Sequence, residues 1–166
     1  QMVTDFRKPL VIMSPKSLLR HPEATSTIEE LTSGSFQTIV DDPKVQDKSA
    51  VKTLAFVSGK FYYDLQAEKE NLGRNDVAFV RVEQLFPLDN DKLKEVIASY
   101  PNVEDYVWAQ EEPKNMGAYG YMLMNFDLVK FRLASPAAAA APAAGSSVRS
   151  KARYAKAIAK VFDKNL

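Results

Sequence analysis

The stretch Val51-Lys52-Thr53-Leu54-Ala55-Phe56-Val57, followed at once by Ser58-Gly59-Lys60, decides the fold class of this chain. An apolar run of this length that closes on a serine and a glycine predicts a buried strand ending in a tight turn. Phe61 and Leu65 then follow at helical spacing, and Gly73 stands where a glycine commonly ends a helix. The sequence therefore predicts a strand, a turn and a helix in succession.

The same order of elements repeats along the chain. Strands are predicted at 9–13, 51–57, 77–82, 106–109 and 128–133. Helices are predicted at 14–22, 25–31, 61–72, 89–100, 116–124 and 148–162. The run 9–13 is apolar throughout, which is typical of a fully buried parallel strand, whereas 128–133 alternates apolar and basic residues, which suggests an edge strand. Strand–helix–strand repetition predicts an α/β fold: a three-layer α/β/α sandwich around a mostly parallel five-stranded sheet, with one antiparallel edge strand.

The remaining segments read as caps, loops and a connector. Thr25 and Ser26 stand at capping-box spacing from Glu29 and Glu30, and 41–50 has the charge and proline content of a solvated loop. We predict three parts: an α/β domain at 1–135, an alanine- and proline-rich connector at 136–147, and a C-terminal segment at 148–166. Its helix is expected to dock on the same domain, the alternative being a frayed tail.

Composition narrows the function. The 166 residues are 46% hydrophobic, enough for one domain with a core, and 22 basic against 21 acidic residues leave a net charge of +1. This balance argues against nucleic-acid or membrane-surface binding. The chain has no cysteine and a single histidine, His21, so disulfides, thiolate catalysis and a histidine-rich metal site are excluded.

No apolar run is long enough to span a bilayer, and the start lacks the form of a signal peptide. We therefore expect a cytoplasmic protein, or one of the mitochondrial matrix if the source is eukaryotic. Because the sequence begins with Gln1, we expect a segment of a longer polypeptide.

An acidic loop follows the strand at 106–109. It reads Gln110-Glu111-Glu112-Pro113, with Asn115 and Gly117 close behind. Loops at the carboxyl edge of an open α/β sheet are where ligand and domain contacts collect. Two adjacent carboxylates can serve as an acid–base pair, but neighbouring side chains usually point apart. We favour a helix N-terminus stabilised by negative charge, or a domain-contact loop.

Basic residues are spread over several predicted strand ends. Ser58-Gly59-Lys60 lacks both the GxxxxGK[ST] and the GxGxxG pattern, so a plain turn is favoured, although amides at a helix start are available to an anion. Lys16 and Arg20 share a helical face, and Arg81 lies near the end of its strand. Together these residues would form a small pocket for a phosphorylated ligand; scattered solvated cations are the favoured alternative.

Five blocks, in the same order, resemble the C-terminal region of the thiamine-diphosphate-dependent first component of the 2-oxoglutarate dehydrogenase complex. They are Arg7-Lys8-Pro9-Leu10, then Ser14-Pro15-Lys16-Ser17-Leu18-Leu19-Arg20-His21-Pro22, Ser58-Gly59-Lys60-Phe61-Tyr62-Tyr63-Asp64-Leu65, Val80-Arg81-Val82-Glu83-Gln84-Leu85, and Gln110-Glu111-Glu112-Pro113 with Asn115 and Gly117. The resemblance covers nearly the whole chain. One departure is Phe131-Arg132-Leu133-Ala134, where such relatives carry an aromatic-x-Gly-Arg element.

The resemblance implies a transketolase C-terminal-like fold and a parent enzyme of the tricarboxylic acid cycle. That enzyme decarboxylates 2-oxoglutarate on thiamine diphosphate and passes the succinyl group to a lipoyl group on the succinyltransferase component. In the family the cofactor and its magnesium are bound by the preceding domains, within a homodimer. This fragment has no GDG element. We therefore expect no catalytic, cofactor-binding or metal-binding residue in it, and no activity from it alone.

The resemblance also implies assembly and regulatory roles. Some relatives carry an allosteric acyl-CoA pocket in this domain, with acetyl-CoA as effector. The expected acyl-CoA or phosphate site comprises Lys16, Arg20, Ser58, Lys60, Arg81 and Gln84. The expected domain-contact loop comprises Gln110, Glu111, Glu112 and Asn115. Two alternatives remain open: a free-standing acyl-CoA or nucleotide binding module, and the same domain of a 2-oxoadipate dehydrogenase.

Overall fold

A five-stranded sheet forms the centre of the larger of two compact units. The computed structural model describes residues 4–166, and the chain divides into units 1–35 and 36–166. The strands, in the spatial order β1-β3-β2-β4-β5, are β1 Ile39–Val40, β3 Val77–Val82, β2 Thr53–Val57, β4 Asp105–Ala109 and β5 Arg132–Ala134. Every neighbouring pair is parallel except β1 with β3. The predicted sheet, mostly parallel with one antiparallel edge strand, is confirmed.

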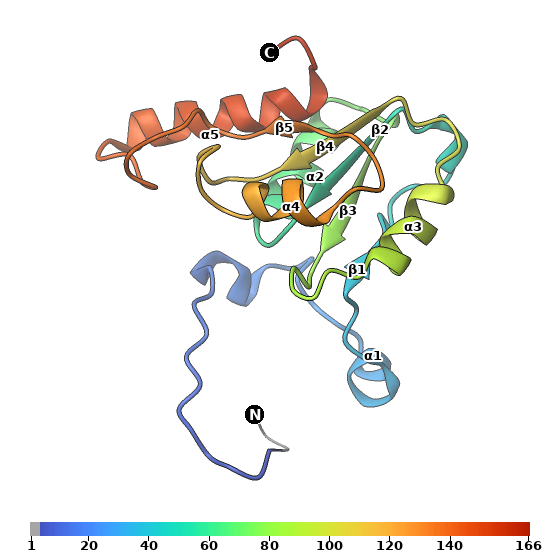
Figure 1. Ribbon diagram of the computed structural model, residues 1–166, viewed down its shortest axis with the longest axis vertical. Coiled ribbons are helices and arrows are strands. Elements are labelled where there is room, and N and C mark those ends of the chain that lie inside the picture. The colour runs from blue at the N-terminus through green and yellow to red at the C-terminus, as the bar shows by residue number, and fades with distance from the viewer. Residues whose placement is uncertain (1–3) are drawn as a thin grey trace. The chain divides into compact units, whose positions relative to one another are not determined.

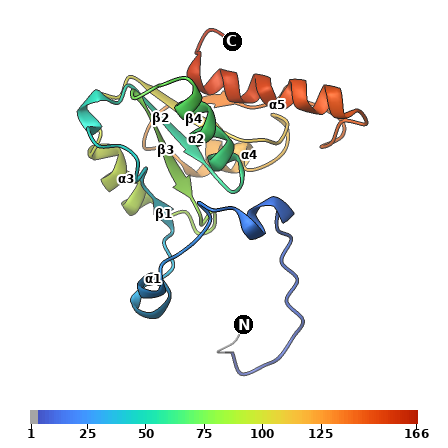
Figure 2. The same ribbon diagram turned by 180° about the vertical axis from the view of Figure 1, so that it is seen from behind.

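Helices cover both faces of this sheet (Figures 1 and 2). The helices of this unit are α2 Phe61–Asn71, α3 Asn90–Ala98, α4 Tyr119–Asn125 and α5 Ser147–Phe162, with a short 3-10 turn, η2, at Lys48–Ala50. Helices α2 and α5 pack on one face, and α3 and α4 pack on the other. The result is the predicted three-layer α/β/α arrangement.

The two-sided covering explains why the strands read as continuous apolar runs. Leu54 and Phe56 of β2 point toward the α3/α4 face, while Ala55 and Val57 point toward the α2/α5 face. All four are fully buried. A strand covered on both faces has no face in contact with solvent, so its sequence does not alternate between apolar and polar residues. Trp108 lies in this core as predicted.

The N-terminal unit contains two short helical elements, η1 Lys16–Arg20 and α1 Ile28–Ser33. A capping box begins α1: the Thr27 hydroxyl accepts from the Glu30 amide at 3.1 Å, and the Glu30 carboxylate accepts from the Thr27 amide at 2.7 Å. The predicted box is therefore present, but it is built on Thr27 and not on the two residues before it. No helix within residues 4–166 has the length and apolar character needed to cross a membrane.

The predicted strand at 9–13 is wrong for this chain. Residues 9–13 lie outside any strand, and Leu10, Val11, Ile12 and Met13 are 60% to 90% exposed. The apolar pattern is that of a buried strand, but no sheet among the described residues takes this run in. The fifth strand of the sheet is β1 instead.

Two edge strands and one loop also differ in detail from the predictions. The antiparallel edge strand, β1, has two residues and was not expected from the sequence. The strand predicted at 128–133 occurs as the shorter β5, which is parallel to β4 and occupies the other edge. The segment 41–50, predicted to be solvated, contains the buried Asp42. Its carboxylate is held by partners far along the chain, which local composition does not reveal.

Candidate functional site at the carboxyl edge of the sheet

The carboxyl ends of the parallel strands meet at one edge of the sheet. The register places Val57 beside both Arg81 and Ala109, and Ala109 beside Ala134. The next residues along β2, β4 and β5 are Ser58, Gln110 and Ser135. Helix α2 begins just beyond Ser58 at the same edge. This edge, where ligands bind in open α/β folds, is the candidate functional site.

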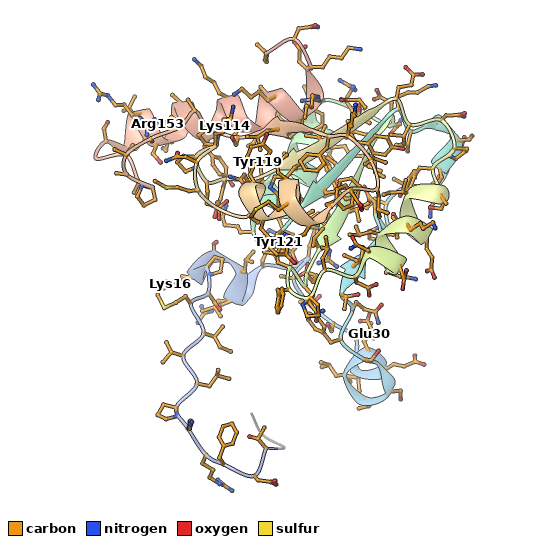
Figure 3. All side chains as sticks on the ribbon, in the orientation of Figure 1. Lys16, Glu30, Lys114, Tyr119, Tyr121 and Arg153 are labelled. Carbon is orange, nitrogen blue, oxygen red and sulfur yellow. The ribbon has the colours of Figure 1, made fainter. Side chains whose placement is uncertain are left out.

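Gln110 is the hydrogen-bond centre of this edge. It is 4% exposed, and its Oε1 accepts from the Trp108 indole N–H at 2.9 Å and from the Tyr119 backbone N–H at 3.0 Å. Its Nε2 donates to three loop carbonyls, those of Glu112 (3.2 Å), Pro113 (3.2 Å) and Met116 (2.8 Å). One side chain therefore joins the end of β4 to the start of α4; Tyr119 is labelled in Figure 3.

Gly117 allows the loop to return to Gln110. Its φ is +66°, a region that favours glycine. A Cβ at this position would lie 3.0 Å from the Glu112 carboxylate and 3.1 Å from both amide atoms of Gln110. Glycine is required here both by backbone conformation and by the closeness of these side chains.

The same loop holds the alanine- and proline-rich segment. The Asn115 side chain donates to the Ala139 carbonyl and accepts from the Ala139 N–H, both at 3.0 Å. The Lys114 N–H donates to the Pro136 carbonyl at 3.1 Å. Segment 136–147 is thus tied to the carboxyl edge by backbone hydrogen bonds, which demand no particular side chain from it.

A polar cluster joins α2 to α5 beside the loop. Lys60 is ion-paired with Asp64, and the Tyr154 hydroxyl donates to the same carboxylate at 2.5 Å. Burial, followed by the Asp64 hydrogen bond, raises the pKa of the Tyr154 hydroxyl. Partial burial, followed by repulsion from Glu112, raises the pKa of the Glu111 carboxyl, while Lys60 opposes the shift.

The hollow beside this cluster is small. Its volume is about 50 Å³, and it is lined by Glu111, Pro113, Pro136, Pro142, Ala144, Ser150, Arg153 and Tyr154. Sites for small molecules usually occupy several hundred cubic ångströms. The hollow therefore does not have the size of a substrate pocket. Glu111 and Glu112 are exposed residues, and although the Glu111 carboxyl is partly enclosed by its neighbours, both can contact a partner surface.

The residues expected at an acyl-CoA or phosphate site lie in several places. Ser58 and Lys60 are at the carboxyl edge, with Lys60 already paired. The Arg81 guanidinium stacks over the Tyr62 ring at 4.9 Å and lies 3.6 Å from the Glu83 carboxylate. The buried Nε of Arg81 has no hydrogen-bond partner among the described residues.

The remaining three expected residues are described within their own units. The Gln84 side chain donates to the Pro87 carbonyl at 2.8 Å, within its own loop. Lys16 (labelled in Figure 3) and Arg20 belong to η1 of the N-terminal unit. Within the larger unit, Ser58, Lys60 and Arg81 lie at the ends of β2 and β3 and at the start of α2, but Lys60 contacts Asp64 and Arg81 contacts Tyr62 and Glu83.

Sequence reasoning missed a buried polar network that joins Asp42 to α2 and β3. The Asp42 carboxylate accepts from Lys69 at 3.1 Å, from Gln66 at 3.0 Å and from the Phe79 backbone N–H at 3.1 Å. The Asp42 side chain is 0% exposed and that of Lys69 is 9% exposed. The only signal was a pair of aspartates, Asp41 and Asp42, after a short apolar pair, which by itself does not indicate burial.

A second missed feature is an arginine clamp on the end of α5. Arg132 binds the Asp105 carboxylate through Nε and Nη2, and its Nη1 and Nη2 also donate to the Lys160 and Val161 carbonyls. Arg74 donates to the Phe162 carbonyl at 3.2 Å. These donors satisfy carbonyls that a helix end leaves unpaired. The basic alternation at 128–133 hinted at a wet strand face, whereas Arg132 has a structural role.

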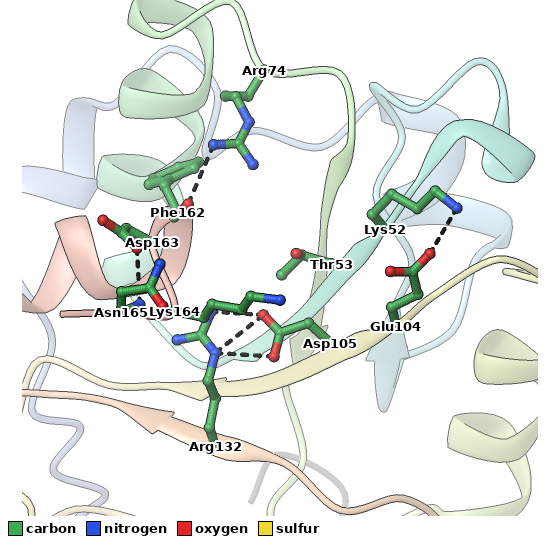
Figure 4. Close-up of a pocket in the computed structure, with 10 residues that line it drawn as sticks. All are labelled: Lys52, Thr53, Arg74, Glu104, Asp105, Arg132, Phe162, Asp163, Lys164 and Asn165. Atoms are coloured by element: carbon green, nitrogen blue, oxygen red, sulfur yellow. Dashed lines mark hydrogen bonds and ion pairs between the residues drawn. The ribbon is translucent and has the colours of Figure 1, made fainter.

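The clamp borders a hollow at the amino ends of the strands (Figure 4). It has a volume of about 270 Å³ and is lined by Lys52, Thr53, Arg74, Glu104, Asp105, Arg132, Phe162, Asp163, Lys164 and Asn165. Most of its charged groups are already paired: Lys52 with Glu104 at 3.0 Å and Arg132 with Asp105 at 2.7 Å. Mutual neutralisation leaves the hollow with little net attraction for a charged ligand.

Comparison with known proteins places this geometry in context. The family described as 2-oxoglutarate dehydrogenase C-terminal matches residues 25–162. The chain is 42% identical over 150 residues to the 2-oxoglutarate dehydrogenase E1 component of Haemophilus influenzae, covering 87% of this chain and 16% of that protein. It is 47% identical over 119 residues to the E1 component of Azotobacter vinelandii, covering 72% of this chain and 13% of that protein.

The chain also matches a human protein that is named for 2-oxoadipate and not for 2-oxoglutarate. The chain is 40% identical over 168 residues to the 2-oxoadipate dehydrogenase complex component E1 of Homo sapiens, covering 98% of this chain and 18% of that protein. The chain thus spans less than a fifth of the length of each of these three relatives.

Proposed function

The chain belongs to the 2-oxoglutarate dehydrogenase C-terminal family, and from this premise we propose that it serves as the C-terminal assembly domain of a 2-oxoacid dehydrogenase E1 component. The whole enzyme would decarboxylate 2-oxoglutarate and transfer the succinyl group to a lipoyl group on its succinyltransferase partner. Relatives named for 2-oxoglutarate and for 2-oxoadipate both match this domain, so 2-oxoadipate is the alternative substrate. The enzyme would work in the bacterial cytoplasm, or in the mitochondrial matrix of a eukaryote.

The Gln110-centred loop is the observation that carries this proposal. Five hydrogen bonds fix the loop to the end of β4 and the start of α4, while Glu111 and Glu112 remain exposed on it. A contact element that is already rigid avoids the free-energy cost of being ordered on association. A braced loop with outward carboxylates suits contact with the preceding domains, or with a second subunit of a homodimer.

The described residues do not fit a site for thiamine diphosphate and magnesium. Magnesium needs converging oxygen ligands, and residues 4–166 contain no group of three side chains of the metal-ligating kinds. The turn before α2, where a diphosphate would have to sit, carries a single positive-φ glycine, Gly59, and not a glycine-rich cradle. We therefore assign the cofactor chemistry to other domains of the proposed enzyme.

Two assays test this proposal. Residues 1–166, mixed with thiamine diphosphate, magnesium and 2-oxoglutarate, should release no carbon dioxide, whereas the polypeptide that includes the upstream domains should release it. Release by residues 1–166 alone would overturn the proposal, and a parallel assay with 2-oxoadipate decides the substrate. In the longer polypeptide, reversing both charges (Glu111→Lys with Glu112→Lys) should weaken assembly in sedimentation experiments. Glu104→Lys, exposed at the opposite edge of the sheet, is the matched control.

A second candidate function, acyl-CoA or phosphate binding, is supported by one observation at Arg81. Its buried Nε is unpaired among residues 4–166, and a buried polar group without a partner is unusual. Calorimetric titration of acetyl-CoA into the wild type should give heat that Arg81→Ala abolishes and Arg149→Ala, an exposed control on α5, retains. Absence of heat from the wild type would end this proposal without affecting the assembly role.

A further inference from the structure

The N-terminal unit exposes an apolar run that has the character of a core strand. Leu10, Val11, Ile12 and Met13 are 60%, 79%, 71% and 90% exposed. Their backbone groups make no hydrogen bond to any other part of residues 4–166. Four consecutive large apolar side chains are rarely exposed on the surface of a folded protein.

The pattern of the run indicates that both of its faces are normally covered by other residues. Successive side chains of an extended segment point to opposite sides, so Val11 and Ile12 present apolar groups on both faces. Runs of this kind belong to strands inside parallel sheets that are covered on both faces. The run is five residues long from Pro9 to Met13, a usual strand length, and a proline is acceptable at the first position of a strand.

The family match places the apolar run outside the C-terminal domain family. The matching C-terminal family covers residues 25–162 and leaves out the apolar run. The human relative nevertheless matches 98% of the chain, although this is 18% of its own length. The run is therefore shared with a relative but lies outside the C-terminal domain family, and residues 1–35 form a compact unit of their own.

We propose that residues 9–13 are a strand of the preceding domain of the same polypeptide, inserted between its strands and covered on both faces. This rests on the proposed function, because it requires the upstream chain that an E1 component would have. The run would then bind the C-terminal domain to its neighbour by strand addition, with η1 and the capped α1 leading from one domain to the other.

Hydrogen exchange gives a direct test. In the longer polypeptide the amides of Leu10 to Met13 should exchange at least about a hundredfold more slowly than in residues 1–166 alone. No difference between the two would overturn the proposal. Slow exchange in residues 1–166 that strengthens with concentration would also overturn it, since a second copy would then be the occupant.

Substitution tests the two-sided burial. Val11→Asp and Ile12→Asp should each leave the stability of residues 1–166 unchanged, yet each should sharply reduce the soluble yield of the longer polypeptide. Val148→Asp is the matched control, because Val148 is 75% exposed on α5, and it should be tolerated in both. If either of the first two were tolerated in the longer polypeptide, burial on both faces would be refuted. Failure of the proposed function shows separately, as absent decarboxylation by a polypeptide whose 9–13 amides are protected.

Discussion

Replacing Gln110 by leucine should destabilise the larger unit strongly. The substitution removes the acceptor for two donors, the Trp108 indole N–H and the Tyr119 backbone N–H. A buried donor left unpaired costs about 1–3 kcal/mol. The two donors together give a loss of about 2–5 kcal/mol, taking the lower half of the range for Tyr119 because it is partly exposed. The three loop carbonyls also lose their donor, and this further cost is not counted.

Urea unfolding measures this loss directly. Trp108 is the single tryptophan of the chain, so its fluorescence reports on the site itself, and circular dichroism follows the helices independently. For a chain of this size, about 1 kcal/mol corresponds to about 2–4 °C in melting temperature. A loss of about 4–20 °C is therefore expected. Gln46→Leu, at an exposed glutamine, is the control and should change stability by less than about 0.5 kcal/mol.

Gln110→Glu separates hydrogen bonding from packing. The variant keeps the shape of the side chain, but its carboxylate would face the carbonyls of Glu112, Pro113 and Met116. This contact raises the folded-state pKa of the new carboxyl, because the protonated form can donate. Such a group stabilises the fold at low pH, and the contribution is lost as pH rises through its folded-state pKa. The variant should therefore approach wild-type stability in acid, whereas Gln110→Leu should not. A loss below about 1 kcal/mol in Gln110→Leu, within the range of one ordinary hydrogen bond, would refute the reasoning.

Three further substitutions probe neighbouring features. Gly117→Ala should lose roughly 1 kcal/mol more in urea than Gly73→Ala, because both have positive φ but only the first meets side chains; equal losses would contradict this. Asp42→Ala should lose about 3–5 kcal/mol in a thermal melt at any salt concentration, since it leaves a buried ammonium unpaired. Glu111→Gln should be at least as stable as wild type at pH 7, because the raised pKa of this carboxyl means that the fold disfavours its charge. The difference should vanish as pH falls below the ordinary carboxyl value of 4.5, and a less stable variant at pH 7 would argue against it.

The sequence predicted the central strands of the sheet well, because a strand buried on both faces has a continuous apolar sequence. The runs at 51–57, 77–82 and 106–109 correspond to β2, β3 and β4 within two residues. The strand β1 has two residues, too few to show any periodicity. It pairs with β3, about forty residues away in the chain (Ile39 with Val82), so nothing local marks it.

The candidate site was predicted in position but not in the direction of its side chains. Strand ends located the edge, yet whether Gln110 points inward depends on a loop that returns at Met116 and Tyr119. The partners of Asp42 lie 24 to 37 residues along the chain, beyond the reach of any local pattern. The proposed three-part division of the chain at 135 and 147, and the acyl-CoA site, stay predictions.

The wrong prediction of a strand at 9–13 has a physical cause. The runs at 9–13 and 51–57 carry the same mark, continuous apolar residues without alternation, and the structure buries only the second among residues 4–166. A pattern of this kind records that both faces of a strand are covered, but it does not record which domain covers them. The exposure of Leu10 to Met13 is what the proposed contact with the preceding domain would remove. In the proposed strand Val11 and Ile12 would point to opposite sides, so a single docked surface could not cover both, whereas a sheet interior could.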